Sequence, residues 1–296
     1  MRTLIILFSI FSFMNSTAQK TLLIQNGHTV LNTKVYSQNN SETIILLHGG
    51  PGVPDEMLEI VAQLKDRYKV ITFEQRGVGE SVCYGCSFKM EDYISDIDAI
   101  TKELNIEKFH LFGHSWGGLY AQIYASKKPE NIKSLFLCSP SSGTNKAWKK
   151  TEREVMLFNK DITTSGEWFN MGWNSLLGMF GSDNGYQKVF SQVLKNYHKG
   201  YGDVKIEQDF LEKIHSRPIN KTRKEIKKYP SLTTLTKSEF PILITYGDGD
   251  IYGNSKNELL KRYPTATVKT IKNSGHIPWK HNPSEFNKTL NAFLND

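Results

Sequence analysis

Cysteine is scarce in this chain of 296 residues, which contains only three. Cys83 and Cys86 are separated by two residues, but no second pair accompanies them and no thioredoxin-like context surrounds them. A zinc site or a redox-active pair is therefore not indicated. A local disulfide between Cys83 and Cys86 and two free thiols are the alternatives. Cys138 lies in an apolar run and is expected to be a small core residue.

Long apolar runs are also rare. The run at residues 4–14 falls short of the roughly 20 residues that a membrane-spanning helix requires. It follows Arg2 and precedes the small and polar residues 15–19, which is the order of a secretory signal peptide. We therefore predict a signal peptide at residues 1–19, a mature chain that begins near Lys20, and export to the periplasm or the medium. Stable membrane insertion after cleavage is not expected.

An acidic excess is absent as well, because 37 Lys and Arg face 30 Asp and Glu, which gives a net charge of +7. Residues 141–236 contain 16 basic and 10 acidic side chains, and the densest basic run is residues 221–228. A solvated helix face is the simplest interpretation of this run. Attraction of anionic substrates or of a negative surface is the alternative. No nucleic-acid-binding module accompanies the charge, so no nucleic-acid partner is predicted.

Apolar runs that alternate with helical segments are what the sequence does contain. The runs have the continuous hydrophobicity of strands buried on both faces, and they lie at residues 43–47, 69–73, 109–112, 132–138, 241–246 and 267–271. Between them, residues 56–65 and 90–104 carry apolar side chains at helical spacing. This alternation predicts an α/β fold in which helices cover both faces of a mostly parallel central sheet.

The alternation stops between residues 141 and 236. This interval is rich in aromatic residues and lysine, its apolar residues are spaced as in short helices, and it is too long to be a loop. We predict that residues 141–236 form a helical cap inserted between the two parts of one core, residues 20–140 and 237–296. Such a cap would cover the carboxyl ends of the strands, where open α/β sheets bind ligands.

The first chemical motif is Gly-His-Ser-Trp-Gly at residues 113–117, which matches the pattern Gly-x-Ser-x-Gly. It follows one predicted strand and precedes a predicted helix at residues 119–126. In that context, the glycines allow a sharp turn that exposes the hydroxyl of Ser115. The N-terminus of the following helix favours negative charge that develops at this point. Ser115 is therefore the predicted nucleophile.

A serine hydroxyl is a weak nucleophile without a base. His276 follows the last predicted strand and stands beside Gly275, so it is the predicted base. His215 and His281 are the alternatives.

The imidazole of the base also needs a carboxylate that orients it. Asp248 and Asp250 both follow the predicted strand at residues 241–246, and either can hold the imidazole. The chain order of nucleophile, acid and base is the one expected for a serine nucleophile in such a fold.

Residues 48–52, His-Gly-Gly-Pro-Gly, follow the first long predicted strand. Glycines let the backbone approach an oxyanion closely, so the amides of Gly50 and Trp116 are the predicted oxyanion-hole donors. A plain turn is the alternative for this segment.

Together these motifs resemble the α/β-hydrolase superfamily, and within it the proline iminopeptidase (prolyl aminopeptidase) branch. The resemblance rests on residues 48–52, Gln-Arg-Gly-x-Gly-x-Ser at 75–81, Ser-Trp-Gly at 115–117, Gly-x-x-Asp at 247–250 and Gly-His at 275–276. It covers about residues 43–138 and 241–296 and does not extend through the cap. It implies an α/β-hydrolase fold and a triad of Ser115, His276 and Asp250, because the family's acid stands three residues after the glycine that closes the strand.

The resemblance implies an aminopeptidase that releases an N-terminal residue, such as proline, from short peptides. Two departures from the family bear on the substrate. Glu74 replaces the usual Asp before Gln-Arg-Gly, and the cap lacks a familiar acidic motif for the substrate's amine. Glu207, Asp209 and Glu212 are candidates for that role by location, and Asp209 and Glu212 are expected to share the helix face that points to the pocket.

A carboxylesterase or lactonase acting on small esters is the alternative activity, and a catalytically silent binding protein is a third. The expected partner is therefore a small peptide or a small ester. No metal cluster, nucleotide loop or cofactor motif is recognisable, so no cofactor and no metal are predicted. The sequence does not indicate an oligomeric state.

Overall fold

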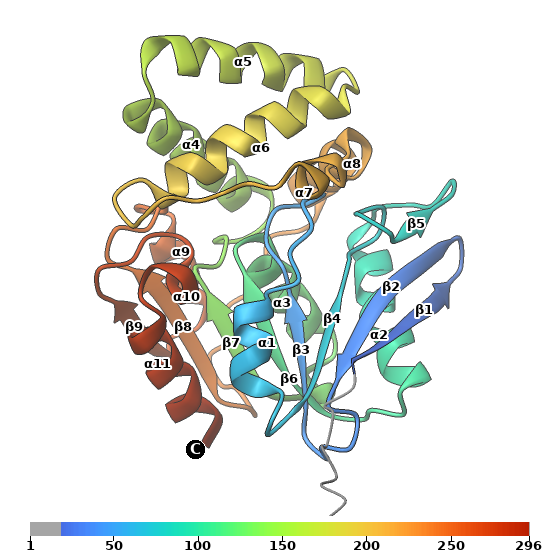
Figure 1. The fold of residues 1–296 in the computed structure, drawn as a ribbon. Helices are drawn as coiled ribbons and strands as arrows, with labels where there is room; N and C mark the ends of the chain where they lie inside the picture. Colours follow the sequence, from blue (N-terminus) through green and yellow to red (C-terminus); the bar gives the residue numbers. More distant parts are fainter. Residues whose placement is uncertain (1–18, 296) are drawn as a thin grey trace, which may run out of the picture.

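A mixed sheet of nine strands forms the centre of the computed structural model, which describes residues 19–295 (Figure 1). The signal peptide predicted for residues 1–19 lies outside the described residues apart from its last position. The strands are β1 (Lys20–Asn26), β2 (Thr29–Tyr36), β3 (Thr43–Leu47), β4 (Lys69–Phe73), β5 (Val82–Cys83), β6 (Phe109–His114), β7 (Ile132–Cys138), β8 (Ile242–Gly247) and β9 (Thr267–Ile271).

The strand order is β1-β2-β4-β3-β6-β7-β8-β9, and β5 pairs with β2. The pairs from β4 through β9 are parallel, whereas β1, β2 and β5 add an antiparallel edge. The predicted mostly parallel sheet is therefore confirmed.

Burial of the strands explains their continuous apolar sequences. All five residues of β3 and all six residues of β8 are buried. β9 differs, because its first four residues are exposed and only Ile271 is buried. The prediction of a strand at residues 267–271 is confirmed, but the prediction that both of its faces are buried is wrong. β9 lies at the edge of the sheet, and its position there leaves much of its surface uncovered.

Helices cover both faces of the sheet. They are α1 (Leu58–Leu64), α2 (Met90–Glu103), α3 (Trp116–Lys127), α9 (Lys256–Arg262), α10 (Pro278–His281) and α11 (Pro283–Asn295). Ile97 of α2, Tyr120 of α3 and Leu259 of α9 belong to one hydrophobic core. Ile60 of α1 and Phe286 of α11 belong to a second core. The apolar faces read from the sequence are therefore the faces that pack on the strands.

Five helices lie between β7 and β8, where the sequence predicts a cap. They are α4 (Asn145–Ile162), α5 (Ser165–Met179), α6 (Asp183–His198), α7 (Gln208–Glu212) and α8 (Ser216–Lys228). They stand over the carboxyl ends of the parallel strands, with α5 farthest from the sheet (Figure 1). No helix within residues 19–295 is both long and apolar enough to cross a membrane.

The basic run of α8 is partly paired. Arg223 and Lys227 contact the carboxylate of Glu152 on α4 at 2.7 and 2.9 Å, and Lys228 lies 3.5 Å from Glu225. The outward-facing Lys221 and Lys224 are exposed to solvent. Residues 221–228 therefore join α4 to α8 and also present a solvated basic face.

Two of the three cysteines form a disulfide, and the third is a free thiol. Cys83 and Cys86 form a disulfide, with their Cα atoms 5.3 Å apart. Cys138 is a free thiol buried at the end of β7, as expected for a core residue.

Candidate active site

Ser115 stands on the sharp turn between β6 and α3. Its backbone adopts φ 54° and ψ −117°, a conformation that side chains other than glycine rarely take. The turn packs so tightly against β3 that a Cβ on Gly117 would overlap the carbonyl oxygen of Leu47. Glycine at residue 117 is therefore required, because a side chain there would collide with β3. The strained backbone of Ser115 lies at the point where its hydroxyl is exposed to the cavity.

The hydroxyl of Ser115 contacts a tyrosine that the motifs do not reveal. Its Oγ lies 3.2 Å from the hydroxyl of Tyr252, which in turn lies 2.9 Å from the Oγ of Ser141. Within the described part of the chain, no hydrogen bond joins Ser115 to His276. Burial raises the pKa of Tyr252 to about 12, so this hydroxyl keeps its proton at neutral pH and can donate to Ser115.

His276 and Asp250 are brought together as predicted. The Nδ1 of His276 lies 3.2 Å from the Oδ1 of Asp250, and both side chains are buried. Burial alone would raise the pKa of Asp250, yet the charge and hydrogen bond of His276 bring it below its ordinary value. The rings of Tyr252 and Tyr197 stand edge-on to the imidazole at centroid distances of 5.0 and 5.1 Å. The imidazole is therefore held on several sides.

The residue before the nucleophile also holds this histidine. The Nε2 of His114 lies 2.8 Å from the carbonyl oxygen of His276, and the two rings pack with centroids 4.9 Å apart. Burial and the neighbouring His276 lower the pKa of His114 to about 3, so its ring is neutral and Nε2–H donates to that carbonyl. His114 thus ties the segment of the base to the turn of the nucleophile.

Asp248 has a different environment from Asp250. It is exposed, and its carboxylate accepts the amides of Gly249, Asn273 and Ser274 at 3.0, 2.9 and 2.9 Å. These bonds, chiefly those from Ser274 and Asn273, hold its pKa below the ordinary value. Asp248 therefore braces the loop that leads to the imidazole, whereas Asp250 faces it.

The two alternative histidines lie elsewhere. His215 contacts Asp183 at 3.2 Å in the α4–α8 segment. His281 stacks on Tyr201 with ring centroids 4.2 Å apart, and its Nδ1 accepts the amide of Gly275 at 3.0 Å. Neither histidine contacts Ser115.

The two predicted oxyanion donors flank the nucleophile. Gly49, Gly50 and Ser115 line one cavity, and the amides of Gly50 and Trp116 donate to no acceptor among the described residues. Trp116 is the first residue of α3, where backbone amides have no partner within the helix. Both amides are therefore free to bind an oxyanion.

Gln75 connects these two segments. Its side chain donates to the carbonyl oxygen of His48 at 3.0 Å and accepts the indole N–H of Trp116 at 2.8 Å. Its backbone amide donates to the Nε2 of His48 at 3.3 Å. Burial lowers the pKa of His48 to about 4, which keeps this nitrogen unprotonated and able to accept. Gln75 of the Gln-Arg-Gly motif therefore fixes the segment of His48 relative to Trp116.

Glu74 acts beside it as a structural carboxylate. It is buried and accepts hydrogen bonds from Asn32 at 3.0 Å and from the amide of Glu80 at 2.7 Å. It packs so closely on Gly79 that a Cβ there would overlap the carboxyl group. The longer acid at this position is thus accommodated by the glycine.

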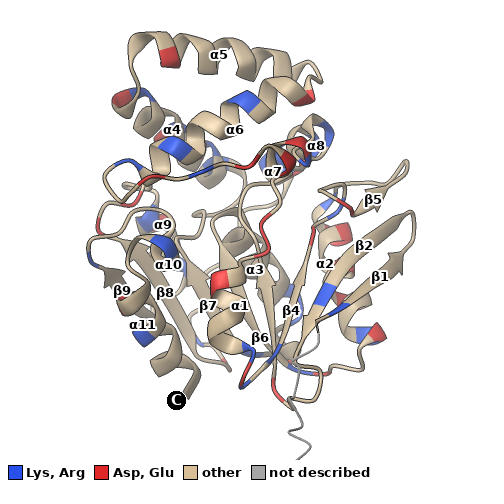
Figure 2. Cartoon of the chain, viewed as in Figure 1, with Lys and Arg blue, Asp and Glu red and all other residues tan. Residues whose placement is uncertain are grey.

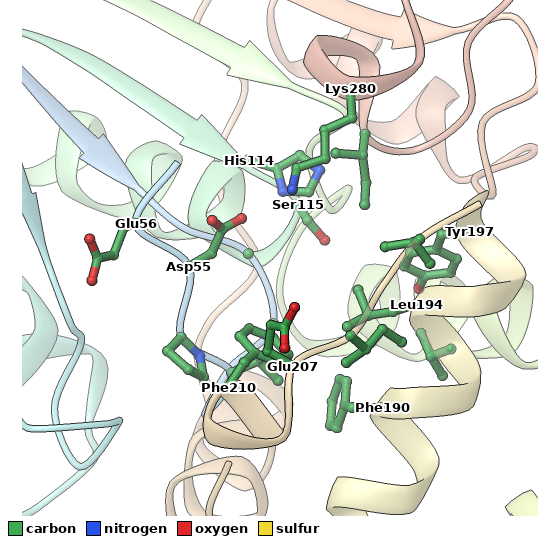
Figure 3. A pocket seen from close by; sticks show the side chains of 18 of the residues that line it. Asp55, Glu56, His114, Ser115, Phe190, Leu194, Tyr197, Glu207, Phe210 and Lys280 are labelled. Atoms are coloured by element: carbon green, nitrogen blue, oxygen red, sulfur yellow. The ribbon is translucent and has the colours of Figure 1, made fainter. Parts of the chain in front are cut away.

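A cavity of about 540 Å³ opens onto Ser115 and His276. The α4–α8 segment contributes an apolar wall, on which Phe190, Leu194 and Tyr197 face the nucleophile (Figure 3). The cavity is large enough for a small ligand, for which pockets of about 300–1,000 Å³ are usual.

Acidic side chains line the cavity from both sides. Asp55 and Glu56 come from the loop after β3, and Glu207 comes from the segment before α7 (Figure 3). Asp55 is half-buried, and burial raises the pKa of its carboxyl. Lys280 enters from α10, and its ammonium lies 3.2 Å from Glu59. The cavity therefore contains two carboxylates from the core, those of Asp55 and Glu56, in addition to the acidic residues that the sequence indicated in the cap.

The prediction that Asp209 and Glu212 both face the pocket is correct for Asp209 only. Asp209 lines the cavity, but Glu212 does not, and its side chain bonds Gln208 at 3.1 Å instead. Glu207 lines the cavity although the sequence analysis did not favour it. The prediction that Glu212 faces the pocket is wrong, because the end of α7 presents Asp209 and Lys213, four residues apart, to the cavity and leaves Glu212 off that face. Glu207 has an extended backbone at φ −73° and ψ 144° before the helix begins, so helical spacing does not predict its direction.

Comparison with known proteins places the chain beside hydrolases of one fold. Residues 42–161 match the sequence model of the α/β-hydrolase fold. The chain is 24% identical to a proline iminopeptidase from Clostridioides difficile (strain 630) over 271 residues, which cover 85% of this chain and 89% of that protein.

Two solved structures share the fold across nearly the whole chain. A proline iminopeptidase from Mycobacterium smegmatis has a TM-score of 0.68 at 18% identity, covering 93% of this chain and 98% of that one. A carboxylesterase from Bacillus subtilis has a TM-score of 0.65 at 15% identity, covering 94% and 92%. The chain thus has the α/β-hydrolase fold, and its relatives support a hydrolase enzyme. Among the curated relatives, it is similar to the proline iminopeptidases.

Proposed function

We propose that this hydrolase is a serine aminopeptidase that releases an N-terminal residue, proline included, from short peptides. Ser115 is the proposed nucleophile, His276 the base and Asp250 the group that orients it. The observation that carries the proposal is the set of carboxylates around the cavity, chiefly Asp55, because an exopeptidase must bind a charged amine. Burying an ammonium without an acidic partner costs several kcal/mol.

The proposed reaction follows from the positions of these groups. The Oγ of Ser115 turns from Tyr252 towards His276, attacks the carbonyl carbon of the first peptide bond and loses its proton to the imidazole. The amides of Gly50 and Trp116 bind the tetrahedral oxyanion. The imidazolium then protonates the leaving nitrogen, the C–N bond breaks and an acyl-enzyme forms. Water, deprotonated by His276, attacks the acyl-enzyme and frees Ser115.

Asp250 supports both proton transfers. Its carboxylate accepts the Nδ1–H of His276, which fixes the tautomer and stabilises the imidazolium. In the resting enzyme the contact between Ser115 and Tyr252 takes the place of the one to His276, and such catalytic contacts often tighten only when substrate is bound.

A carboxylesterase that acts on small esters is the second candidate. The apolar wall formed by Phe190, Leu194 and Tyr197 favours it, and so does the similar fold of the solved carboxylesterase. An ester substrate without an amine needs no carboxylate in the cavity. The carboxylate of Asp55 is therefore required for the peptidase activity and not for the esterase activity.

The deciding assay compares three substrate classes on the chain that begins at Lys20. They are proline and alanine arylamides, their N-acetylated forms, and short-chain aryl esters. The proposal expects the free-amine arylamides to be preferred, and Ser115→Ala to abolish turnover and labelling by an organophosphonate. A preference for acetylated arylamides or esters would establish the esterase alternative.

A matched pair of variants locates the amine site. Asp55→Asn removes a carboxylate of the cavity, whereas Glu212→Gln removes one that lies outside it. We expect Asp55→Asn to raise KM for the free-amine arylamide and to leave the acetylated form unaffected. Glu212→Gln should change neither. Equal effects of Asp55→Asn on both substrate forms would contradict a role in amine binding.

A further inference from the structure

The outermost helix, α5, exposes a stripe of large apolar side chains. Phe169, Trp173, Leu176 and Phe180 are 73%, 56%, 40% and 84% exposed. Their spacing of four, three and four residues places them on one face of the helix and its C-terminal end. Single exposed apolar residues are ordinary, but a continuous stripe indicates a surface that another body covers.

This stripe is not required for the packing of the fold. α5 packs through its other side, where Met171 and Gly178 are buried. The exposed residues do not line the active-site cavity either. The helix stands at the far end of the α4–α8 segment from the sheet (Figure 1).

The charge of α5 and its surroundings limits what can cover the stripe. Within α5 the one charged residue is Glu167, which closes a capping box with Thr164 at the start of the helix. Residues 141–236 as a whole have 16 basic and 10 acidic side chains. Exposed lysines lie on the neighbouring helices α4 and α6, among them Lys160 and Lys188, and Figure 2 shows basic residues on α6 next to α5, which carries one acidic residue and no basic one.

A second copy of the chain fits these features poorly. An aromatic side chain has about 150–250 Å² of surface, so the exposed parts of Phe169, Trp173 and Phe180 amount to about 300–500 Å². The exposed parts of the aliphatic residues at the same end of the helix add a smaller area; these residues are Leu176, Leu177 and Met179. A stable protein interface buries about 800 Å² on each partner. Face-to-face pairing would also bring two basic α4–α8 segments together, and their like charges would repel.

We propose that α5 docks the protein peripherally on an anionic lipid surface. Phe169, Trp173 and Phe180 enter the boundary between headgroups and acyl chains, and the surrounding lysines attract the headgroups. Peripheral helices use aromatic and leucine side chains on one face and Lys or Arg on the other, and here the basic residues come from the neighbouring helices α4 and α6 instead of α5 itself. Each lysine or arginine near such a surface adds about 1 kcal/mol of attraction. The docking does not depend on the proposed peptidase activity.

The test measures cosedimentation of the chain that begins at Lys20 with two kinds of vesicle. One is phosphatidylcholine alone, and the other is an equimolar mixture of phosphatidylcholine and phosphatidylglycerol. We expect binding to the mixed vesicles that weakens as salt is added, because screening removes the headgroup attraction. The double variant F169S/W173S should bind at least about tenfold more weakly, because it loses two inserted rings.

The control is the double variant L23S/V268S, which removes apolar side chains that are 70% and 46% exposed on β1 and β9. It should bind vesicles like the wild type. Thermal unfolding and hydrolysis of a soluble aryl ester should be the same for all three proteins, which shows that the variants are folded.

Three results would overturn the proposal. The first is no binding to the mixed vesicles. The second is equal binding by F169S/W173S and the wild type, which would assign the binding to charge alone. The third is a dimer, detected by light scattering, that F169S/W173S dissociates while neither protein binds vesicles.

Discussion

Replacing Asp250 by Asn should nearly abolish activity while leaving the fold intact. Two unit charges at the 3.2 Å that separates Nδ1 of His276 from Oδ1 of Asp250 attract one another by about 5 kcal/mol at an effective dielectric constant of about 20. This attraction exists only when the imidazole is protonated, as in the transition state. At about 1.4 kcal/mol for each factor of ten, its loss predicts a fall in kcat of three to four orders of magnitude, roughly.

The neighbouring acid provides the control. Asp248→Asn keeps the side-chain oxygen that can accept one backbone amide, and the residue does not contact His276. We expect its kcat to fall less than about tenfold, with the main effect on stability, as for an exposed polar substitution. Both variants are assayed with whichever substrate the wild type hydrolyses, next to circular dichroism and thermal unfolding. A kcat for Asp250→Asn within tenfold of wild type, or a larger loss in Asp248→Asn, would refute the assignment.

The stability difference between wild type and Asp248→Asn should depend on pH. The hydrogen bonds from Ser274 and Asn273 hold the pKa of Asp248 below its ordinary value, so the folded state favours the charged form. The stabilisation is then complete above the ordinary pKa of about 4 and is lost as pH falls through the lowered value. Unfolding curves of the two proteins should therefore differ most near pH 7 and converge in acid. A gap that widens in acid would contradict this account.

Three further outcomes are expected. Tyr252→Phe removes the hydroxyl that holds Ser115 in the resting enzyme and that Ser115 leaves when it turns to His276, so kcat should rise by roughly 2- to 10-fold at unchanged KM, because a neutral hydrogen bond is worth about 0.5–1.5 kcal/mol; a kcat that falls more than about tenfold would show that the hydroxyl acts in the transition state instead. Gly79→Ala should destabilise the fold by about 1–3 kcal/mol, since its φ is 53° and a Cβ meets Glu74, and denaturant titration measures this. Thiol titration of the purified protein, denatured without reductant, should find one free thiol, that of Cys138, and three would exclude the disulfide.

The sequence predicts the parts of the site that local backbone geometry determines. Ser115 lies on a turn between a strand and a helix, and the apolar run, the glycines and the helical spacing that predict these elements all lie within a few residues of it. His276 and Asp250 follow strands of one parallel sheet, whose carboxyl ends meet at the same edge. Their proximity therefore follows from topology.

How the walls of the cavity are assembled could not be predicted from the sequence, because they bring together segments that are distant in the chain. Asp55 and Glu207 face one cavity from opposite sides, and no local pattern relates them. Tyr252 lies two residues after Asp250, and nothing in its position shows that its ring reaches Ser115. The prediction for Glu212 failed for the same reason, since the tertiary position of α7 decides that Asp209 and Lys213 face the cavity and Glu212 does not. Contacts made by tertiary packing leave no periodic mark in the sequence.

The bridge made by Gln75 has a consequence for how the enzyme responds to its surroundings. One neutral amide sets the spacing between the segment of His48 and the indole of Trp116, and a neutral amide does not titrate. The spacing between the two walls of the proposed oxyanion hole should therefore not change with pH above the pKa of His48, about 4, below which the ring of His48 takes a proton. Widening this spacing would break a buried hydrogen bond, at about 1–3 kcal/mol, so substrate meets a hole that is already assembled.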